Sequence, residues 1–317
     1  MGDKSEIKKI LKILIYQIML IPRLIKLKSE IDEYYFFFGS GLILFPTVFL
    51  KILGKKFGFI LTGSYSKSSK CLYHGIKKII YYSQHNIERI NYHLADRLFV
   101  FSKTLIKDFN IEKFSYKIDS DSCPLFIDMD SFKPLNDFSK REKKIGFIGR
   151  LSSEKGVEPL LEAIDELSKD KSFDYTFCIV GDGPLRKKDE EYQSKRNNLE
   201  CKGWVKQTEI PMLMNSFRFH ILPSFTEAWG GAHLEAMCCG TIGIANSVGG
   251  IPDYSVDGFN SFLLKDNTKD GIVNTIKQVV RIEEDKLLEI SHNARKWVED
   301  NFTEEAAAKR WKRILHD

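Results

Sequence analysis

Short apolar runs alternate with stretches of helical spacing over the second half of the chain, and this alternation limits the fold more than any other feature. The runs predict buried strands at residues 143–150, 175–181, 199–205, 218–224 and 241–247, with 260–264 as a candidate sixth. Between the first two, from Val157 to Leu167, apolar residues recur every three or four positions. Strands and helices in this order are typical of a parallel sheet covered on both faces, so we expect an α/β domain.

The first part of the chain has the same pattern in a shorter form. Strands are expected at 33–41 and 56–64 with an apolar helix at 42–53 between them, and residues 86–105 indicate helix, strand and helix. A change of composition at 135–144 marks a linker. We therefore predict a first Rossmann-like domain over 1–138, a second over 139–300 and a C-terminal helix over 301–317. Three strands are few for a doubly wound domain, so the first is expected to be incomplete.

The composition excludes several classes of protein. Of the 317 residues, 43% are hydrophobic and 29% charged, which is typical of a globular protein with real cores. The net charge of +5 is too small for a nucleic-acid binder and suits an anionic small molecule or an anionic membrane surface. The six cysteines form no CxxC pair and no Cys/His set at zinc spacing. A reduced, intracellular protein without a metal site is the simplest interpretation.

The N-terminal segment KKILKILIYQIMLIPRLIKLK, residues 8–28, is apolar and flanked by lysines. Gln17 interrupts it and Pro22 follows, so its apolar runs are far shorter than the roughly 20 residues that span a bilayer. No small-residue cleavage site follows, and Glu6 stands where a myristoylation pattern needs Ser or Thr. Two interpretations remain open: a helix that faces the core, or an interfacial helix that rests on anionic lipid.

Glycines and charged residues follow the predicted strands of the second domain. Ligands of open parallel sheets bind where these strand ends meet. The segments concerned are Gly149-Arg150, Gly181-Asp182-Gly183, Gly203-Trp204 and Glu227 to Gly231. A helix that begins at Gly230-Gly231 would present unpaired backbone N–H groups to an anion. Arg150 and Lys155 on the first loop would add the positive charge that neutralises a diphosphate.

Two carboxylates flank this pair of glycines. If the helix begins at Gly231, Glu235 lies about one turn, roughly 6 Å, into it, and Glu227 lies before it. A diphosphate bound over the glycines would then have a carboxylate towards each end. Because carboxylates accept hydrogen bonds from vicinal diols, a sugar at one end and a ribose at the other would fit, and this is the shape of a nucleotide-sugar.

These residues resemble the retaining GT-B glycosyltransferases of the family 4 (group 1) type. The family's E-x7-E mark is similar to EAWGGAHLE, Glu227 to Glu235, which follows a strand ending in Pro223-Ser224. Four further segments match in order: GFIGRLSSEKG, IVGDGPL, KGWV and VGGIPDYSVDGFNSFLL, which together with the first motif extend from Gly146 to Leu264. The resemblance implies two Rossmann-like parallel-sheet domains that face each other across a cleft.

By position, the resemblance assigns the donor phosphates to one group of residues. Arg150 and Lys155 would bind the diphosphate, and the backbone of Gly230, Gly231 and Ala232 would face the phosphates or the sugar. These two cations would also act in catalysis by stabilising the departing diphosphate. No metal or other cofactor is implied.

The other donor contacts implied by the resemblance come from three places. Glu227 would hold the sugar hydroxyls, as a third catalytic residue, and Glu235 the ribose diol, while the strand end at Trp204-Val205 would contact the base. The implied reaction is that of a hexosyltransferase-like enzyme. It transfers a sugar from a UDP- or GDP-sugar to a glycan or lipid-linked acceptor with retained configuration, in polysaccharide or glycolipid biosynthesis. The location implied is cytoplasmic, at the inner face of the membrane if the N-terminal helix is interfacial.

The chain departs from the family pattern in its first domain. The family's first strand and glycine-rich loop have no counterpart before residue 33, so we expect a shortened acceptor domain that self-associates or needs a protein partner. Ser64 stands where many members have His or Asp near the reacting sugar, and Asp253 replaces a usual glutamate. The alternative function is therefore a non-catalytic or partner-dependent subunit that retains the donor site.

Other candidate residues have simpler structural interpretations. Gly181-Asp182-Gly183 lacks the third glycine of a dinucleotide fingerprint, so it indicates a turn at the sheet edge rather than a nicotinamide site. His233 and Cys238-Cys239 are expected to pack inside. A catalytic role remains open for three histidines of the first domain: His74, His85 and His93.

Overall fold

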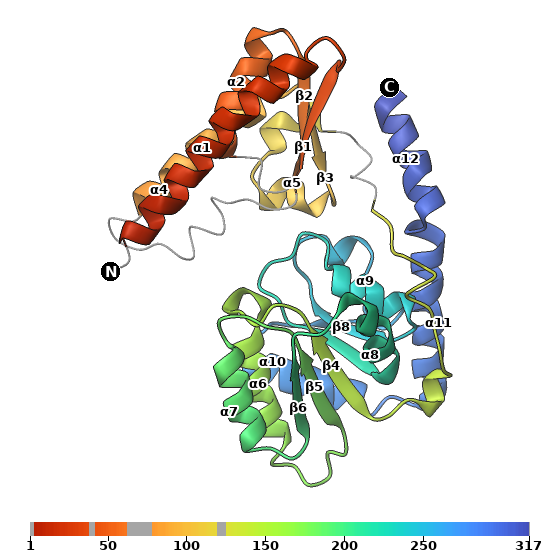
Figure 1. Cartoon of the computed structure of the whole chain (residues 1–317). Coiled ribbons are helices and arrows are strands. Elements are labelled where there is room, and N and C mark those ends of the chain that lie inside the picture. Colours follow the sequence, from red (N-terminus) through yellow and green to blue (C-terminus); the bar gives the residue numbers. More distant parts are fainter. Residues whose placement is uncertain (1–2, 38–41, 62–77, 119–124, 317) are drawn as a thin grey trace. The chain divides into compact units, whose positions relative to one another are not determined.

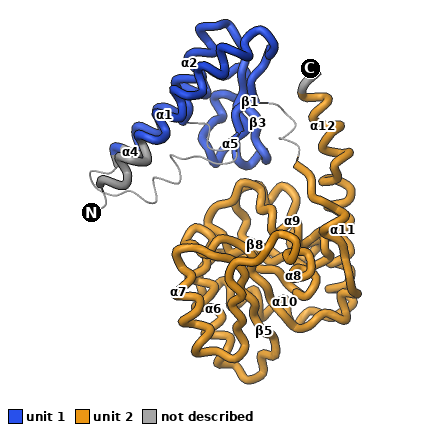
Figure 2. The backbone as a smooth tube through the Cα atoms, viewed as in Figure 1, with its two compact units in different colours: residues 1–123 blue, residues 124–317 orange. Residues whose placement is uncertain are grey.

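The computed structural model describes residues 3–37, 42–61, 78–118 and 125–316. The chain forms two compact units, residues 1–123 and 124–317 (Figure 2). Each has its own parallel sheet and its own buried core. The predicted α/β class is confirmed.

The sheet of the second unit contains six parallel strands in the order β6-β5-β4-β7-β8-β9. Their bounds are β4 (Lys144–Ile148), β5 (Thr176–Val180), β6 (Leu199–Gly203), β7 (Phe219–Leu222), β8 (Ile242–Asn246) and β9 (Phe262–Leu264). All six lie within the runs that the sequence predicts. On one side of β4 lie β5 and then β6. The next strand in the chain, β7, pairs with the other side of β4, and β8 and β9 follow it. The direction of the chain across the sheet therefore switches between β4 and β7.

Helices cover both faces of this sheet (Figure 1). The helices form two packed groups, since α6 contacts α7 and α10 while α9 contacts α8 and α11. The helices are α6 (Val157–Leu167), α7 (Arg186–Ser194), α8 (Ile210–Ser216), α9 (Gly231–Cys238), α10 (Lys269–Val279), α11 (Glu284–Asn301) and α12 (Glu304–His316). This arrangement buries the apolar strands on both sides, as their unbroken apolar runs require.

The segment before β4 belongs to the second unit from residue 124 onward, whereas the composition predicts that the first domain extends to residue 138. Ile127 N–H donates to the carbonyl of Phe302 at 2.9 Å, and the Phe138 side chain is buried in the second core. The buried Arg141 guanidinium donates to Thr241 Oγ1 and to the carbonyl of Cys239, each at 2.5 Å. These contacts are long-range in sequence, so a change in local composition does not reveal them.

The first unit has a sheet of three parallel strands among its described residues, in the order β1-β2-β3. The strands are β1 (Glu33–Phe37), β2 (Lys56–Leu61) and β3 (Arg97–Val100), and the α-helices are α1 (Asp3–Leu27), α2 (Phe45–Ile52), α4 (Lys78–Leu94) and α5 (Thr104–Asp108). Phe57 and Phe59 of β2 are buried in the core between sheet and helices. No helix in the described ranges is both long and apolar enough to cross a membrane.

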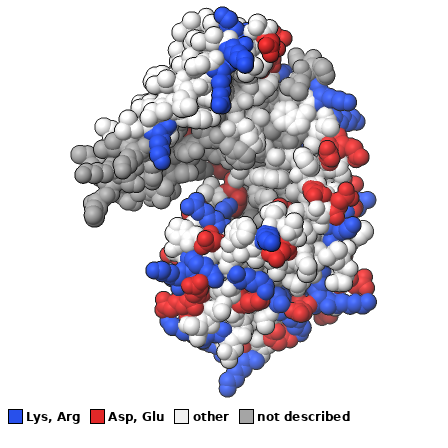
Figure 3. Space-filling model, in the orientation of Figure 1, with Lys and Arg blue, Asp and Glu red and all other residues white. Residues whose placement is uncertain are grey.

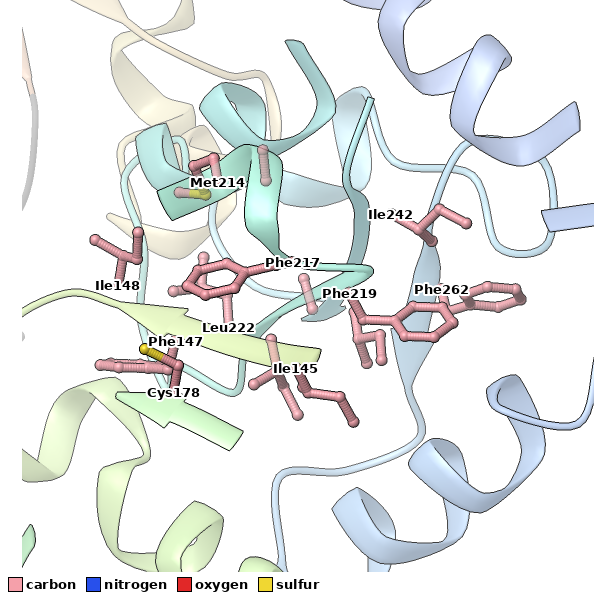
Figure 4. Close-up of a cluster of buried hydrophobic side chains, with 14 of the residues drawn as sticks. Ile145, Phe147, Ile148, Cys178, Met214, Phe217, Phe219, Leu222, Ile242 and Phe262 are labelled. Carbon is pink, nitrogen blue, oxygen red and sulfur yellow. The ribbon is translucent and has the colours of Figure 1, made fainter. Parts of the chain in front are cut away.

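Close packing in the second core requires a glycine on β4. A Cβ added to Gly146 would lie 2.0 Å from Cε2 of Phe217, whose ring is fully buried. Figure 4 shows this ring over the strand that carries Ile145 and Phe147. The Phe217 ring therefore fits against β4 only because residue 146 has no side chain.

We expect Gly146→Ala to lower the free energy of unfolding of the second unit by about 2–3 kcal/mol, because overpacking a dense core forces side chains away from their rotamers. Urea denaturation of the full chain measures the effect. Phe217→Leu in the same chain should recover part of the loss, and the two substitutions should couple in a double-mutant cycle. Strictly additive effects would show that the ring is not the obstacle.

Candidate functional site

A lysine and a glutamate form an ion pair across the switch point of the second sheet. Lys155 lies on the loop that follows β4, and Glu227 on the loop that follows β7. Lys155 Nζ is 2.5 Å from Glu227 Oε1, and the same oxygen accepts a hydrogen bond from Ser224 Oγ at 2.7 Å. The Glu227 side chain is only 8% exposed and that of Lys155 26%. The pair is therefore held in place beside solvent, where a ligand can reach the lysine.

Backbone contacts bring these two loops together. Gly156 has a φ of +69°, and a Cβ there would lie 2.0 Å from the carbonyl oxygen of Pro223. The Phe225 N–H donates to the carbonyl of Glu154 at 2.9 Å. A glycine is thus required just after Lys155, because any side chain would push the β4 loop away from the β7 loop.

Helix α9 begins at Gly231, as the sequence predicts, and Gly230 is its N-cap with a φ of +70°. A Cβ on Gly230 would lie 2.8 Å from Tyr254 Oη, which itself donates to the carbonyl of Trp229 at 2.7 Å. No side chain caps this helix. Its first N–H groups are therefore available to an anion at the same edge of the sheet as Lys155.

Glu235 lies one turn into α9 and is partly buried. No ion pair or hydrogen bond reaches its carboxylate from the part of the chain that the structure describes. Burial raises the pKa of Glu235 to about 7. A carboxyl in this position would gain from a ligand that donates hydrogen bonds to it, because such bonds favour the ionised form.

The loops after β5 and β6 occupy the far side of the same edge. A Cβ on Gly181 would lie 1.8 Å from the carbonyl oxygen of Gly149, so this glycine permits two loops to touch. The prediction of a sheet-edge turn there is confirmed. After β6, the Trp204 side chain is 73% exposed, while Val205 is partly buried against the core.

Among the described residues, Arg150 forms its ion pair with Glu154 and not with Glu227. Its side chain is 67% exposed, and its nearest ion-pair partner is Glu154, at 4.0 Å from Nη1 to Oε1. The predicted pair of cations therefore consists of one fixed lysine and one arginine that extends into solvent from the same loop.

The histidine and the two cysteines that were expected to pack inside are buried, as predicted. His233 is fully buried, with Nε2 3.0 Å from Ser255 Oγ, and burial lowers its pKa to about 4. Cys238 and Cys239 are buried in the core. This neutral histidine belongs to α9 itself, and its ring packs the helix against Gly243 of β8.

The candidate residues of the first domain are not assembled into a site in the described ranges. His85 stacks on Tyr81, with ring centroids 5.9 Å apart, and the exposed His93 meets the edge of Phe114 at 4.8 Å. His74 and Ser64 lie outside the described residues. In the second unit, Asp253 is exposed at the end of a 3-10 turn, Ile251–Asp253.

Two residues of the site were missed in the sequence. Ser224 belongs to the matched Pro-Ser pair and binds Glu227, and Tyr254 belongs to the matched segment after β8 and holds the backbone at Gly230. Their places in the motifs were the available signal. Only the three-dimensional contacts show what their hydroxyls bind.

An open hollow of about 470 Å³ lies away from this site, where α6 and α7 end. Its lining includes lysines that are paired to their own helices, for example Lys169 with Glu166 at 3.0 Å and Lys195 with Glu191 at 2.6 Å. It gathers no set of catalytic groups. Within the described residues, no group of three or more His, Cys, Asp or Glu side chains could hold a metal ion.

The sequence profile described as "Glycosyl transferases group 1" matches residues 128–297 of this chain. An uncharacterized glycosyltransferase of Methanocaldococcus jannaschii is 27% identical over 291 residues, which are 88% of this chain and 72% of that protein. The 2-deoxystreptamine glucosyltransferase of Streptomyces kanamyceticus is 33% identical over 161 residues, 50% of this chain and 41% of that enzyme. This chain matches less than half the length of some curated relatives.

Among solved structures, the Anabaena protein HepE in complex with UDP and glucose is similar, with a TM-score of 0.74 and 19% identity over 94% of this chain and 81% of that one. At this identity the likeness concerns the fold, and it agrees with the predicted GT-B type with two Rossmann-like domains.

The pKa of Glu235 predicts a pH-dependent cost in stability. Folded and unfolded states both hold the proton below the ordinary pKa of 4.5, and both lose it above about 7, so the free energy of unfolding falls as pH rises between these values. Glu235→Gln lacks this loss and should be more stable than the parent by about 1–3 kcal/mol at pH 8, and by little at pH 4.5. Thermal unfolding across this range, with the exposed Glu162→Gln as control, measures it. A pH-independent difference would contradict the burial argument.

Proposed function

Because the chain belongs to the group 1 glycosyl transferases, we propose that it transfers a sugar from a UDP-sugar to a glycan or lipid-linked acceptor. The observation that carries this proposal is the Lys155–Glu227 pair at the sheet's switch point, beside the uncapped N-terminus of α9. Open α/β sheets bind their ligands at this point, and a fixed cation next to free N–H groups suits a diphosphate.

The strand order supports one orientation of the donor along the edge of the sheet, with its base at one end and its sugar at the other. β6, β5, β4 and β7 are consecutive neighbours, so the loop of Val205 and the loop of Glu227 are three strand spacings apart, about 14 Å. The loop of Lys155 lies between them, after β4. A base near Trp204-Val205, a diphosphate near Lys155 and a sugar near Glu227 would extend along this edge in the order in which they are joined.

Lys155 can serve the diphosphate without leaving Glu227. Its ammonium group has three N–H donors, and Glu227 uses one of them. The backbone of Gly230, Gly231 and Ala232 would supply further donors, and the exposed Arg150 would close on the outer phosphate oxygens. As the bond between the sugar and the diphosphate breaks, these groups stabilise the negative charge on the departing oxygen.

The two glutamates would hold the hydroxyl groups of the donor. Glu227 faces the sugar whose charge develops in the reaction, and Glu235 accepts the ribose diol, which would supply the hydrogen-bond donors that its carboxylate lacks. We further propose that the anomeric configuration is retained and that no metal takes part, since the lysine, the arginine and the helix terminus together supply the positive charge.

A UDP-sugar is proposed rather than a GDP-sugar because HepE, similar in fold, was crystallised with UDP and glucose. A catalytic role is proposed rather than that of a non-catalytic subunit, since relatives such as the 2-deoxystreptamine glucosyltransferase are named for transfer. The test is calorimetry of the full chain with UDP, GDP and uridine, followed by release of UDP from UDP-sugars with lipid-linked acceptors. Binding of uridine as tight as that of UDP would overturn the assignment of the site.

We expect Lys155→Ala and Arg150→Ala each to weaken UDP binding by about 1.5–3 kcal/mol, the range for hydrogen bonds to charged groups. The affinity for uridine, which has no phosphate, should change far less. Isothermal titration with both ligands measures the difference, and Lys171→Ala, an exposed lysine near the ends of α6 and α7, is the matched control. Equal losses for UDP and uridine would mean that the cations support the fold rather than the phosphates.

The two carboxylates should differ in kinetics. Glu235→Gln should chiefly raise the KM for the donor, because a ribose contact is similar in the ground and transition states, and Glu227→Gln should chiefly lower kcat. Each loss should be on the order of 10- to 100-fold. Steady-state rates with varied donor provide the measurement. If the effects were exchanged between the two variants, the sugar and the ribose would have been assigned to the wrong carboxylates.

A further inference from the structure

Helix α1 contacts the rest of the first unit through a narrow stripe of buried residues. Gln17 is only 3% exposed, and its Oε1 accepts hydrogen bonds from the N–H groups of Leu44 and Phe45 at 2.9 and 3.1 Å. Leu24 is the other buried residue of the described part of this helix. The polar residue that interrupts the apolar sequence is therefore the one that faces inward, and its apolar neighbours face out.

The outward face of α1 is apolar over most of its length. Its exposed large apolar residues include Leu11 (50%), Ile15 (54%), Ile18 (59%), Met19 (65%) and Ile25 (48%). With Pro22, they recur at spacings of three and four, which places them on one side of the helix. The stripe from Leu11 to Ile25 is about 20 Å long at 1.5 Å per residue. A soluble surface rarely leaves such a continuous stripe uncovered.

Cations border this stripe, and acidic residues are absent from it. Lys12, Arg23 and Lys26 are all exposed, and at about 100° per residue they fall together along one side of the apolar stripe. The sequence from Leu11 to Lys28 contains no Asp or Glu. On the face that Figure 3 shows, the described atoms of the first unit are mainly white with more blue than red, whereas those of the second unit mix blue and red.

We propose that the outward face of α1 binds the surface of an anionic lipid membrane. The helix lies in the plane of the interface, with Ile15, Ile18 and Met19 at the boundary between headgroups and acyl chains. Lys12, Arg23 and Lys26 meet the lipid phosphates. Of the two interpretations open from the sequence, the exposed stripe supports the interfacial one.

The charge pattern favours lipid over a second copy of the chain. Two α1 helices packed stripe to stripe would bring Lys12, Arg23 and Lys26 of both copies together, and neither copy has an Asp or Glu between Leu11 and Lys28 to pair with them, which costs free energy. An anionic surface supplies the missing opposite charge along the whole helix. Binding should therefore need both the apolar stripe and its cationic border.

The experiment is flotation of the full chain with vesicles of phosphatidylcholine alone or with about one third phosphatidylserine. We expect binding only to the anionic vesicles, with a marked decrease between about 0.1 and 0.5 M NaCl, since salt screens the attraction. Lys12→Glu/Lys26→Glu should lower the partition coefficient at least about 10-fold. Ile15→Ser/Met19→Ser should lower it by a similar factor, because it removes buried apolar area.

The matched control is Lys171→Glu/Lys296→Glu, which makes the same change of charge at two exposed positions of the second unit and should leave vesicle binding unchanged. Titration with UDP checks that each variant is folded. Equal binding to neutral vesicles, or an equal loss in the control, would overturn the proposal. So would light scattering that shows a dimer which Ile15→Ser/Met19→Ser dissociates, since a second copy would then cover the stripe.

Discussion

The ion pair between Lys155 and Glu227 is the contact around which the second unit's functional edge is organised. It joins two loops that belong to neighbouring strands but lie 72 positions apart in the chain. The contact depends on a glycine at 156, on the buried hydroxyl of Ser224 and on the order in which β4 and β7 pair. Together these features hold a lysine at the edge of solvent with its charge only partly satisfied, and a diphosphate can complete it.

Glu235 differs from Lys155 in its surroundings. Where Lys155 has a partner before any ligand arrives, Glu235 has none in the described residues, and burial alone raises its pKa to about 7. Ionisation of this buried carboxyl therefore costs free energy, and hydrogen bonds from a diol would reduce that cost. Under the proposed function, Glu235 exchanges stability for ligand affinity, a trade-off that active sites commonly show.

Much of this architecture could be predicted from the sequence because it depends on local pattern. The strands follow apolar runs, and α9 begins at Gly231 because Gly230 adopts a conformation that suits glycine. The remaining features depend on contacts distant in sequence. Neither the Tyr254 hydroxyl beneath Gly230 nor the solvent-exposed position of Arg150 has a local signature, and the local pattern leaves both a core-facing and an interfacial α1 open. Gln17 illustrates the reason, since its burial comes from the N–H groups of a helix start nearly thirty residues away.

The hydrogen bond from Ile127 to Phe302 closes the second unit upon itself, because the chain enters this unit and completes α11 at neighbouring points. Without α12, the two ends of this unit would lie side by side, and such a unit is modular in a practical sense. It can be inserted into a surface loop of another protein through one narrow opening, or its ends can be joined and new ones made elsewhere, with little strain on the fold. The hydrogen bond that holds the segment before β4 in place thus also makes the six-stranded half of the molecule portable.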